Sequence, residues 1–128
     1  MVKAETKGLV VSVKPEYLEE QSNPMLLSYV FMYTITIENR SDYTVQLLRR
    51  HWFIFDSNGE NREVEGEGVI GETPVVAPGE SYTYSSGCNL STEIGKMEGT
   101  YLMKNLANDD RFKIQIPEFH LVTPGKLN

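Results

Sequence analysis

The amino-acid sequence predicts an all-β domain: an antiparallel β-sandwich of about seven to eight strands, immunoglobulin-like or fibronectin type III-like. Three observations predict it. Apolar residues alternate with period two, turn signals separate the alternating runs, and no run repeats apolar residues at helical spacing for long enough to cover a sheet. A closed barrel is the structural alternative. We expect the 128 residues to form one domain, 1–128, with loose termini at 1–7 and 123–128.

The strongest strand signal is the run 29–39, in which apolar and mostly polar positions alternate up to a turn at 39–42. An earlier run, 9–13, alternates in the same way until Pro15. Proline has no N–H to donate to a neighbouring strand, so we expect Pro15 to end this strand.

A third strand is predicted over 45–56, with Leu48 and Trp52 on one face. It leads into the pair Asn58-Gly59, a hairpin signal typical of type I′ turns, which need positive φ at both central positions. The remaining strands are expected over 62–68, 81–86, 99–104 and 112–119, and single helical turns over 15–24 and 90–98.

Composition excludes several function classes. The chain has 12 Lys and Arg against 18 Asp and Glu, a net charge of -6, so a nucleic-acid backbone would be repelled. No segment is apolar for long enough to span a membrane, and residues 1–7 carry charges where a signal peptide would need an apolar run. The single cysteine, Cys88, forms no internal disulfide, which suits a reducing compartment. We expect a cytoplasmic protein that binds neither nucleic acid nor membrane.

Residues 66–71 match the G-x-G-x-x-G pattern of dinucleotide-binding loops. Gly66, Gly68 and Gly71 are therefore candidate phosphate-binding residues. However, such a loop must lead into a helix, and two prolines follow within eight residues, while nearby glutamates repel a phosphate. A β-bulge or tight turn is the favoured interpretation, because glycine supplies positive φ and lets strands approach closely. A backbone-amide nest for a small anion is the alternative.

No catalytic, metal or cofactor site emerges from the remaining residues. His51 and His120 are the two histidines, in no metal-ligand spacing and with no further ligands marked beside them. Cys88 lacks the surroundings of a nucleophile and is interpreted as a buried apolar residue. Trp52 is expected to anchor the core, with a surface hot spot as the alternative. Three arginines are candidates for an acid-binding face or are simply solvated: Arg49, Arg50 and Arg62.

The pattern of glycines, aromatics and prolines resembles the bacterial ApaG family over nearly the whole chain, from about residue 10 to residue 120. The tryptophan-bearing strand at 51–56 fits as well. The signature comprises the run 64–80 followed by Tyr82, Tyr84, Ser86, Cys88, Leu90, Thr92, Gly95, Met97, Gly99, Tyr101 and Met103.

This resemblance implies a fibronectin type III-like sandwich with no assigned catalytic activity. It also implies an association with cobalt and magnesium tolerance or efflux, and a proposed pyrophosphate loop at Gly66, Gly68 and Gly71. Similar domains in some F-box and polymerase-interacting proteins serve as interaction modules. We therefore expect a non-enzymatic module that binds a protein partner without a cofactor, with a homodimer left open. The alternative is a small-ligand sensor for phosphate, pyrophosphate or a dinucleoside polyphosphate at residues 66–71.

Overall fold

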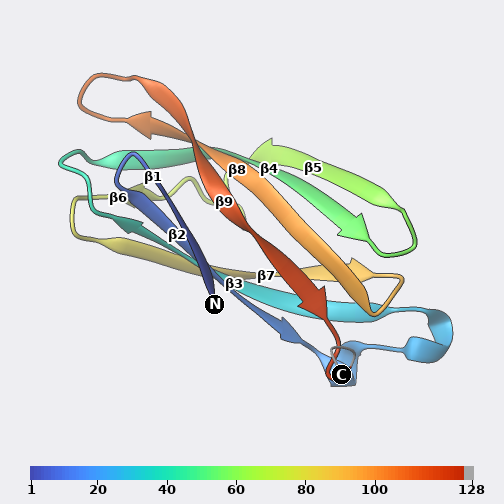
Figure 1. Ribbon diagram of the computed structural model, residues 1–128. Coiled ribbons are helices and arrows are strands. Elements are labelled where there is room, and N and C mark those ends of the chain that lie inside the picture. The colour runs from blue at the N-terminus through green and yellow to red at the C-terminus, as the bar shows by residue number, and fades with distance from the viewer. Residues whose placement is uncertain (126–128) are drawn as a thin grey trace.

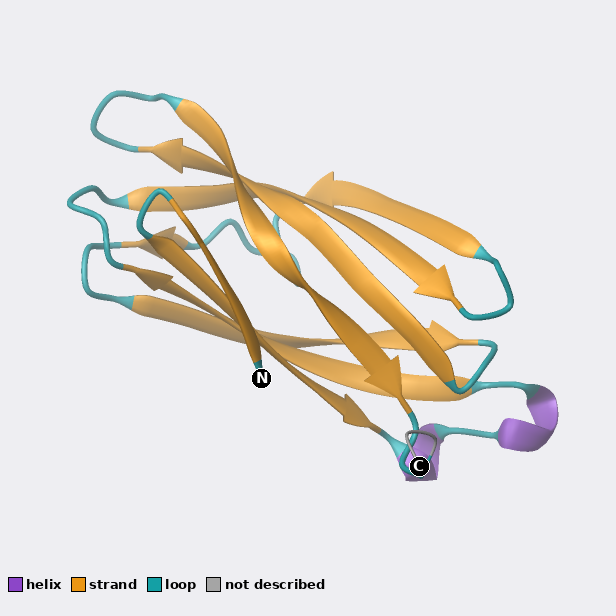
Figure 2. Ribbon diagram, in the orientation of Figure 1, coloured by secondary structure: helices purple, strands orange, loops and turns teal. Residues whose placement is uncertain are grey.

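The computed structural model describes residues 1–125, in which nine strands form two antiparallel sheets packed face to face (Figure 1, Figure 2). The first sheet has the order β1-β2-β3-β7, and the second β5-β4-β8-β9 with β6 paired to β4. The first sheet comprises β1 (Val2–Thr6), β2 (Leu9–Tyr17), β3 (Tyr29–Asn39) and β7 (Ser81–Leu90). The second comprises β4 (Val45–Asp56), β5 (Asn61–Glu67), β6 (Val75–Val76), β8 (Ile94–Asn105) and β9 (Arg111–Val122).

This architecture confirms the predicted immunoglobulin-like antiparallel sandwich. Two 3-10 turns, η1 (Glu19–Gln21) and η2 (Pro24–Leu26), connect β2 to β3 (Figure 2). Across residues 1–125, no helix has the length and apolar character needed to cross a membrane.

The inner faces of the two sheets enclose one hydrophobic core. Alternate residues of β3, such as Phe31 and Ile35, are fully buried. Trp52 of β4 is 3% exposed, and its ring centroid lies 5.3 Å from that of Tyr33 and 5.9 Å from that of Phe119. The prediction that Trp52 anchors the core is confirmed, and the alternative of a surface hot spot is wrong.

The N-terminal segment 1–7, expected to be loose, is instead ordered as β1 and the start of a turn. β1 pairs antiparallel with the first five residues of β2, and Lys7 and Gly8, with φ of 50° and 83°, form the two-residue turn between them. At the other end, Thr123 is buried and its N–H donates to the Glu93 carbonyl at 3.0 Å, so it is not loose. The rest of the expected loose end includes 126–128, which lie outside the described residues.

Pro15 does not end the first strand, contrary to expectation. β2 runs from Leu9 to Tyr17, and Pro15 pairs with Tyr33 of β3. β1 pairs with β2 only as far as Val13, so beyond that point β2 is an edge strand. A residue without an N–H is tolerated on such an edge.

The segment 90–98, where the sequence allowed a helical turn, lies mostly in strands β7 and β8, whereas the turn allowed within 15–24 exists as η1. β9 continues through Pro117 because its register on β8 shifts between Met97 and Gly99, which creates a β-bulge. Glycine and proline therefore act here inside paired strands and not only between them.

A second β-bulge, in β4, decides which residues enter the core. The register of β4 on β8 shifts between Leu47 and Arg49, so Leu48 is the extra residue. The simple alternation that places Leu48 beside Trp52 on the core face is wrong: Leu47 is fully buried and Leu48 is half-buried. After the bulge the alternation places Arg50 on the inward face with Trp52.

The hairpin predicted from Asn58-Gly59 connects β4 to β5, but its turn is not type I′. Gly59 has φ of 92°, whereas Asn58 is not in the left-handed region. The N–H of Gly59 donates to the Asp56 carbonyl at 3.0 Å, as in a three-residue loop that ends on a left-handed glycine.

The two long sides of the sandwich differ. On one side β1 and β2 contact β9, and the N–H of Gln115 donates to Oγ1 of Thr6 at 3.1 Å (Figure 1). On the other side β5 and β7 end their sheets as free edges, and no comparable seam joins them in the part of the chain that the structure describes. The sandwich is closed along β1 and β9 and open along β5 and β7.

Candidate functional site

The open side of the sandwich holds two adjoining hollows of about 300 Å³ and 240 Å³. Both are lined by Tyr33, Arg50, Trp52 and Ser86, which come from β3, β4 and β7. The hollows are therefore two parts of one cleft between the sheets. We call it the Arg50 cleft; its further walls include Tyr84, Cys88, Arg62 and the 66–71 segment.

Arg50 faces this cleft because the bulge at Leu48 turns it inward. Its Nη1 donates to the carbonyl oxygens of Glu67 and Gly68, both at 3.0 Å. A Cβ on Gly66 would lie 3.0–3.2 Å from the guanidinium atoms of Arg50. The missing side chain at Gly66 thus makes room for the arginine head group.

The G-x-G-x-x-G segment is a tight hairpin turn. The N–H of Val69 donates to the Glu72 carbonyl at 2.8 Å, and the N–H of Glu72 donates back at 2.9 Å. Between them Ile70 and Gly71 have φ of 43° and 78°, as in a type I′ turn. Gly68 has φ of 63°, and a Cβ there would lie 2.2 Å from the Glu72 carbonyl oxygen. The interpretation as a tight turn with a close backbone approach is confirmed.

The backbone groups of this turn are not oriented as in a phosphate-binding loop. Such a loop points several free N–H groups at the anion. Here the N–H of Gly68 donates to the Leu48 carbonyl at 2.8 Å, and those of Val69 and Glu72 donate to each other's carbonyls. The segment presents carbonyls to Arg50 instead. Phosphate binding by the three glycines stays a prediction, and this geometry does not favour it.

The charge of Arg50 is not balanced by a nearby carboxylate. Among residues 1–125 no carboxylate lies within 4.0 Å of its guanidinium. Burial raises the pKa of Tyr33, Tyr84 and Tyr101, and the positive charge of Arg50 opposes each rise. The cleft therefore combines neutral phenols with an Arg50 head group that has no carboxylate partner among the described residues.

Arg62 closes one end of the cleft. From β5 its Nη2 donates to the Asn89 carbonyl on β7 and contacts Sγ of Cys88 at 3.6 Å. Cys88 is 8% exposed, and burial raises the pKa of its thiol, so the protonated form dominates and a nucleophilic role has no support. Arg49, in contrast, points outward, with Nη2 3.6 Å from Glu65. The three arginines do not share one acid-binding face, but two of them line the cleft.

The outer face of the second sheet carries a cluster that the sequence did not mark. Nε2 of His51 lies 2.9 Å from Glu63, and Nδ1 lies 3.2 Å from Glu65. Ligand-type atoms of the three residues lie within 4.8 Å of one another, and the imidazole stacks on Phe53 at 4.6 Å. Strand pairing of β4 with β5 brings them together, which only the register could reveal. His120 lies two strands away on β9 and is exposed.

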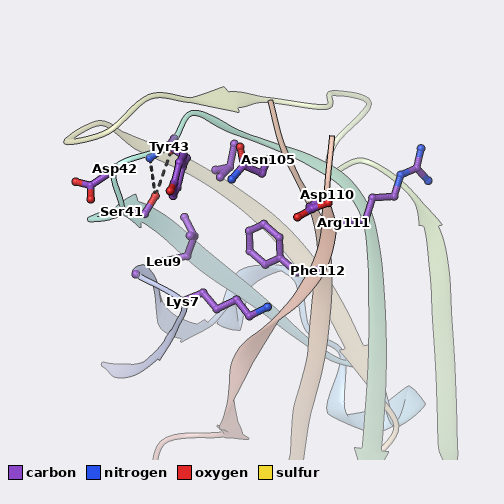
Figure 3. A pocket seen from close by; sticks show the side chains of 11 residues that line it. Lys7, Leu9, Ser41, Asp42, Tyr43, Asn105, Asp110, Arg111 and Phe112 are labelled. Atoms are coloured by element: carbon purple, nitrogen blue, oxygen red, sulfur yellow. Dashed lines mark hydrogen bonds between the residues drawn. The ribbon is translucent and has the colours of Figure 1, made fainter. Parts of the chain in front are cut away.

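A larger hollow, of about 440 Å³, lies at one end of the sandwich (Figure 3). Leu9 and Phe112 form its apolar part, with Nζ of Lys7 5.3 Å from the Phe112 ring centroid. Asp42 and Arg111 point away from this centre in opposite directions (Figure 3). Because its charged groups are of mixed sign and do not converge, we take the Arg50 cleft as the candidate functional site.

The two-sheet sandwich with one open side defines the class of this protein: a small immunoglobulin-like β domain with an inter-sheet cleft. Residues 19–105 match the family model of the ApaG domain. The chain is 50% identical over 123 residues to Protein ApaG of Shewanella halifaxensis, which covers 96% of this chain and 97% of the relative. It is 51% identical over 124 residues to Protein ApaG of Brucella canis, with 97% and 95% covered. The chain belongs to the ApaG family, as its sequence pattern suggested.

Solved structures agree with this membership. A crystal structure from Bordetella pertussis superposes with a TM-score of 0.88 at 45% sequence identity, over 92% of this chain and 95% of that one. A protein from Archaeoglobus fulgidus, only 13% identical, reaches a TM-score of 0.51 over 88% and 95% of the two chains. The second likeness shows the fold alone.

Proposed function

We propose that this protein is a non-catalytic binding module that takes up an extended segment of a partner protein along the free edge of β7. The observation that carries the proposal is the character of that edge. The ten residues of β7 contain no charged side chain and no proline, and β7 pairs only with β3. A free edge of this kind offers unpaired N–H and C=O groups to an added strand, here as far as Cys88, because Arg62 already donates to the Asn89 carbonyl.

The other edges are protected in ways that β7 is not. β1 is five residues long and carries Lys3 and Glu5. β9 is covered by β1 and contains Pro117. Charged side chains follow β5 along most of its length: Arg62, Glu63, Glu65 and Glu67. Charges, proline and cover are the usual means of preventing edge pairing, so β7 is the edge left open for it.

A partner protein suits this edge better than a second copy of the chain. In a symmetric dimer the β7 strands would pair with each other, and each copy would present the same surface to the other. The arginines beside β7, Arg50 and Arg62, would then approach their own counterparts, and like charges repel. A segment of different sequence avoids this repulsion.

A matched pair of variants tests the edge. The hydroxyls of Ser85 on β7 and Thr34 on β3 are hydrogen-bonded at 2.9 Å and face outward. Ser85→Lys and Thr34→Lys therefore lose the same hydrogen bond and gain the same charge, but only Ser85→Lys places the charge on the edge strand. Each variant and the wild type would capture partners from native lysate, with quantitative mass spectrometry. The captured protein is then purified and reconstituted with each form.

We expect one stoichiometric partner that wild type and Thr34→Lys bind alike and that Ser85→Lys binds at least about tenfold more weakly. In the reconstituted complex, hydrogen exchange should slow at the amides of β7. Equal binding to Ser85→Lys, or protection confined to another strand, would contradict the proposal. So would a wild-type dimer in sedimentation velocity that Ser85→Lys dissociates, because the occupant would then be a second copy.

Divalent-cation binding is a second candidate function, favoured by the cluster of His51, Glu63 and Glu65. Imidazole nitrogen with carboxylate oxygens is a donor set that first-row divalent metals accept. Titration calorimetry with Zn²⁺ and Mg²⁺ tests it, with His51→Gln as the variant and the exposed His120→Gln as its control. Saturable Zn²⁺ binding that His51→Gln alone removes would support the site. Binding that both variants keep would exclude it.

A further inference from the structure

We propose that the Arg50 cleft is a specificity subsite that takes the carboxylate of an acidic side chain carried by the segment that adds to β7. This inference rests on the proposed function and names the chemistry of the partner: an extended segment with Asp or Glu at the position that faces the cleft. Four features of the structure support it: the unpaired charge of Arg50, the size and lining of the cleft, its position beside β7, and the contacts that position the arginine.

The first support is the unused binding capacity of Arg50. Its Nη1 is engaged by the two carbonyls of Glu67 and Gly68. Across the described residues, its Nε and Nη2 have no hydrogen-bond partner and no carboxylate lies within 4.0 Å. These two nitrogens form the side of the guanidinium that binds a carboxylate with two parallel hydrogen bonds.

The second support is the size and lining of the cleft. The cleft is divided into two hollows of about 300 Å³ and 240 Å³, and either one has room for a single side chain. Aromatic rings of Tyr33 and Trp52 line both. A carboxylate on a short apolar stem suits this space, since the stem contacts the rings and the oxygens reach Arg50.

The third support is the position of the cleft beside β7. Tyr84 and Ser86 of β7 line it and point inward, whereas Ser85 between them points outward. Side chains of an added strand follow the same alternation, so every second side chain would turn toward the gap between β5 and β7. One such residue opposite Ser86 would enter the cleft while the backbone pairs with β7.

The fourth support is the way in which the 66–71 turn positions the side chain of Arg50. Gly66 leaves room for the guanidinium, and the turn directs two carbonyls at its Nη1. Nη1 of the arginine is fixed in this way, whereas Nε and Nη2 have no hydrogen-bond partner among the described residues. The glycine segment is then a positioning device for a cation that binds an anion, and not itself the anion-binding element.

The test measures anion binding in the cleft apart from strand addition. The probe is N-acetyl-glutamate N-methylamide, and the matched control ligand is the glutamine analogue, which differs only in charge and one atom type. Chemical shifts of the Arg50 Nε–H and the Trp52 indole N–H are followed by NMR in the full-length protein. Inorganic phosphate and pyrophosphate form separate arms, because free anions could use the same arginine.

We expect saturable shifts with the glutamate probe and at least about tenfold weaker binding of the glutamine analogue. Arg50→Gln, followed through Trp52, should lose the response. Gly66→Ala, which displaces the guanidinium but leaves the charge, should weaken it. Arg50→Lys covers the case in which Arg50→Gln does not fold, and it should retain only part of the affinity. Ser85→Lys should leave the probe response unchanged.

Equal binding of the two analogues, or a response that survives Arg50→Gln, would overturn the inference. A response to phosphate or pyrophosphate without one to the glutamate probe would do so as well, and would assign the cleft to a free anion. The proposed function fails separately, through Ser85→Lys. A partner that depends on Ser85 but binds wild type and Gly66→Ala equally, with its acidic residues replaceable by amides, would leave strand addition intact and remove only the acidic subsite.

Discussion

The hydroxyl of Tyr84 on β7 is hydrogen-bonded to the hydroxyl of Tyr101 on β8, so a polar contact crosses the interior from one sheet to the other. Tyr84 is 6% exposed and Tyr101 is fully buried. Each hydroxyl satisfies the other where water cannot reach Tyr101. Tyr84 also lines the Arg50 cleft, so this hydrogen bond connects a wall of the cleft to β8 of the second sheet.

A double-mutant cycle should reveal this coupling. Tyr84→Phe and Tyr101→Phe should each lower the free energy of unfolding by about 1–2 kcal/mol, because each leaves a buried hydroxyl without its partner. The double variant should lose clearly less than the sum, since neither hydroxyl remains to be satisfied. Urea denaturation of the four proteins measures this. Strict additivity would show that the hydrogen bond contributes nothing.

Stability should fall steeply in alkaline solution. Burial raises the pKa of Tyr33, Tyr84 and Tyr101 above the ordinary value of 10.0. As the pH rises above 10, these phenols ionise in the unfolded chain while the folded protein still holds their protons. The free energy of unfolding therefore decreases, by up to about 1.4 kcal/mol per pH unit for each phenol.

Denaturation midpoints between pH 8 and pH 11.5 check this pH dependence. The double variant Tyr84→Phe/Tyr101→Phe is the control. Its slope should be shallower, because two of the four phenols with a raised pKa are removed and only those of Tyr33 and Tyr82 remain. A slope equal to that of the wild type would mean that other groups govern alkaline unfolding.

Two glycines of the 66–71 turn should respond differently to alanine. Gly71 has φ of 78° with nothing within 4 Å of a Cβ, so Gly71→Ala should cost only the backbone strain, about 1 kcal/mol. Gly68 has φ of 63° and a Cβ there would clash with the Glu72 carbonyl at 2.2 Å, so Gly68→Ala should cost several times more. Thermal denaturation separates the two costs, and equal values would contradict the close approach.

Ile70 offers the opposite test. It is β-branched, 57% exposed, and held at φ of 43°, a region that costs such residues about 1–2 kcal/mol. Ile70→Gly should therefore raise the free energy of unfolding by roughly 1 kcal/mol, although it removes apolar surface. Its side chain lines the Arg50 cleft, which is a reason for a strained residue to be kept there. A loss of stability would mean that Ile70 contributes more by packing than its exposure suggests.

Asn39 should be the most sensitive polar residue of the β3–β4 connection. It is fully buried, its Nδ2 donates to the carbonyls of Tyr43 at 2.7 Å and Val76 at 2.9 Å, and its Oδ1 accepts from Ser41. Asn39→Ala should lower the free energy of unfolding by about 2–3 kcal/mol, because buried carbonyls lose their donors. Asn58→Ala, an exposed turn residue, is the control and should cost well under half as much in the same chemical denaturation experiment.

Where the sequence predicted the fold well, side-chain alternation was undisturbed. β3 keeps it through all eleven residues, and its predicted bounds match the structure. The missed strand β1 is an exposed edge whose residues Lys3 to Thr6 show no clear apolar face, because such a strand buries little. The prediction that Pro15 ends its strand failed for a related reason. Proline ends a strand only where a neighbouring strand needs an N–H donor at that position, and the neighbours of a strand are known only from the sheet order.

The cleft was harder to predict than the fold because a register shift creates it. One extra residue at Leu48 exchanges the faces of β4, which buries Leu47 and turns Arg50 inward, and no local pattern marks that bulge. The glycines were recognised as a tight turn, but their relation to Arg50 depends on pairing between β4 and β5. Likewise, His51 acquires Glu63 and Glu65 as neighbours only through that pairing.

The contacts between β1 and β9 join the two sheets along one long side only. Because one long side is tied by Gln115 and Thr6, we expect thermal fluctuations that separate the sheets to be smallest there and largest along β5 and β7. The width of a pocket on that side would change whenever the two sheets separate. A ligand bound in the cleft would therefore slow the separation of the two sheets. The core would become more rigid even at positions far from the cleft.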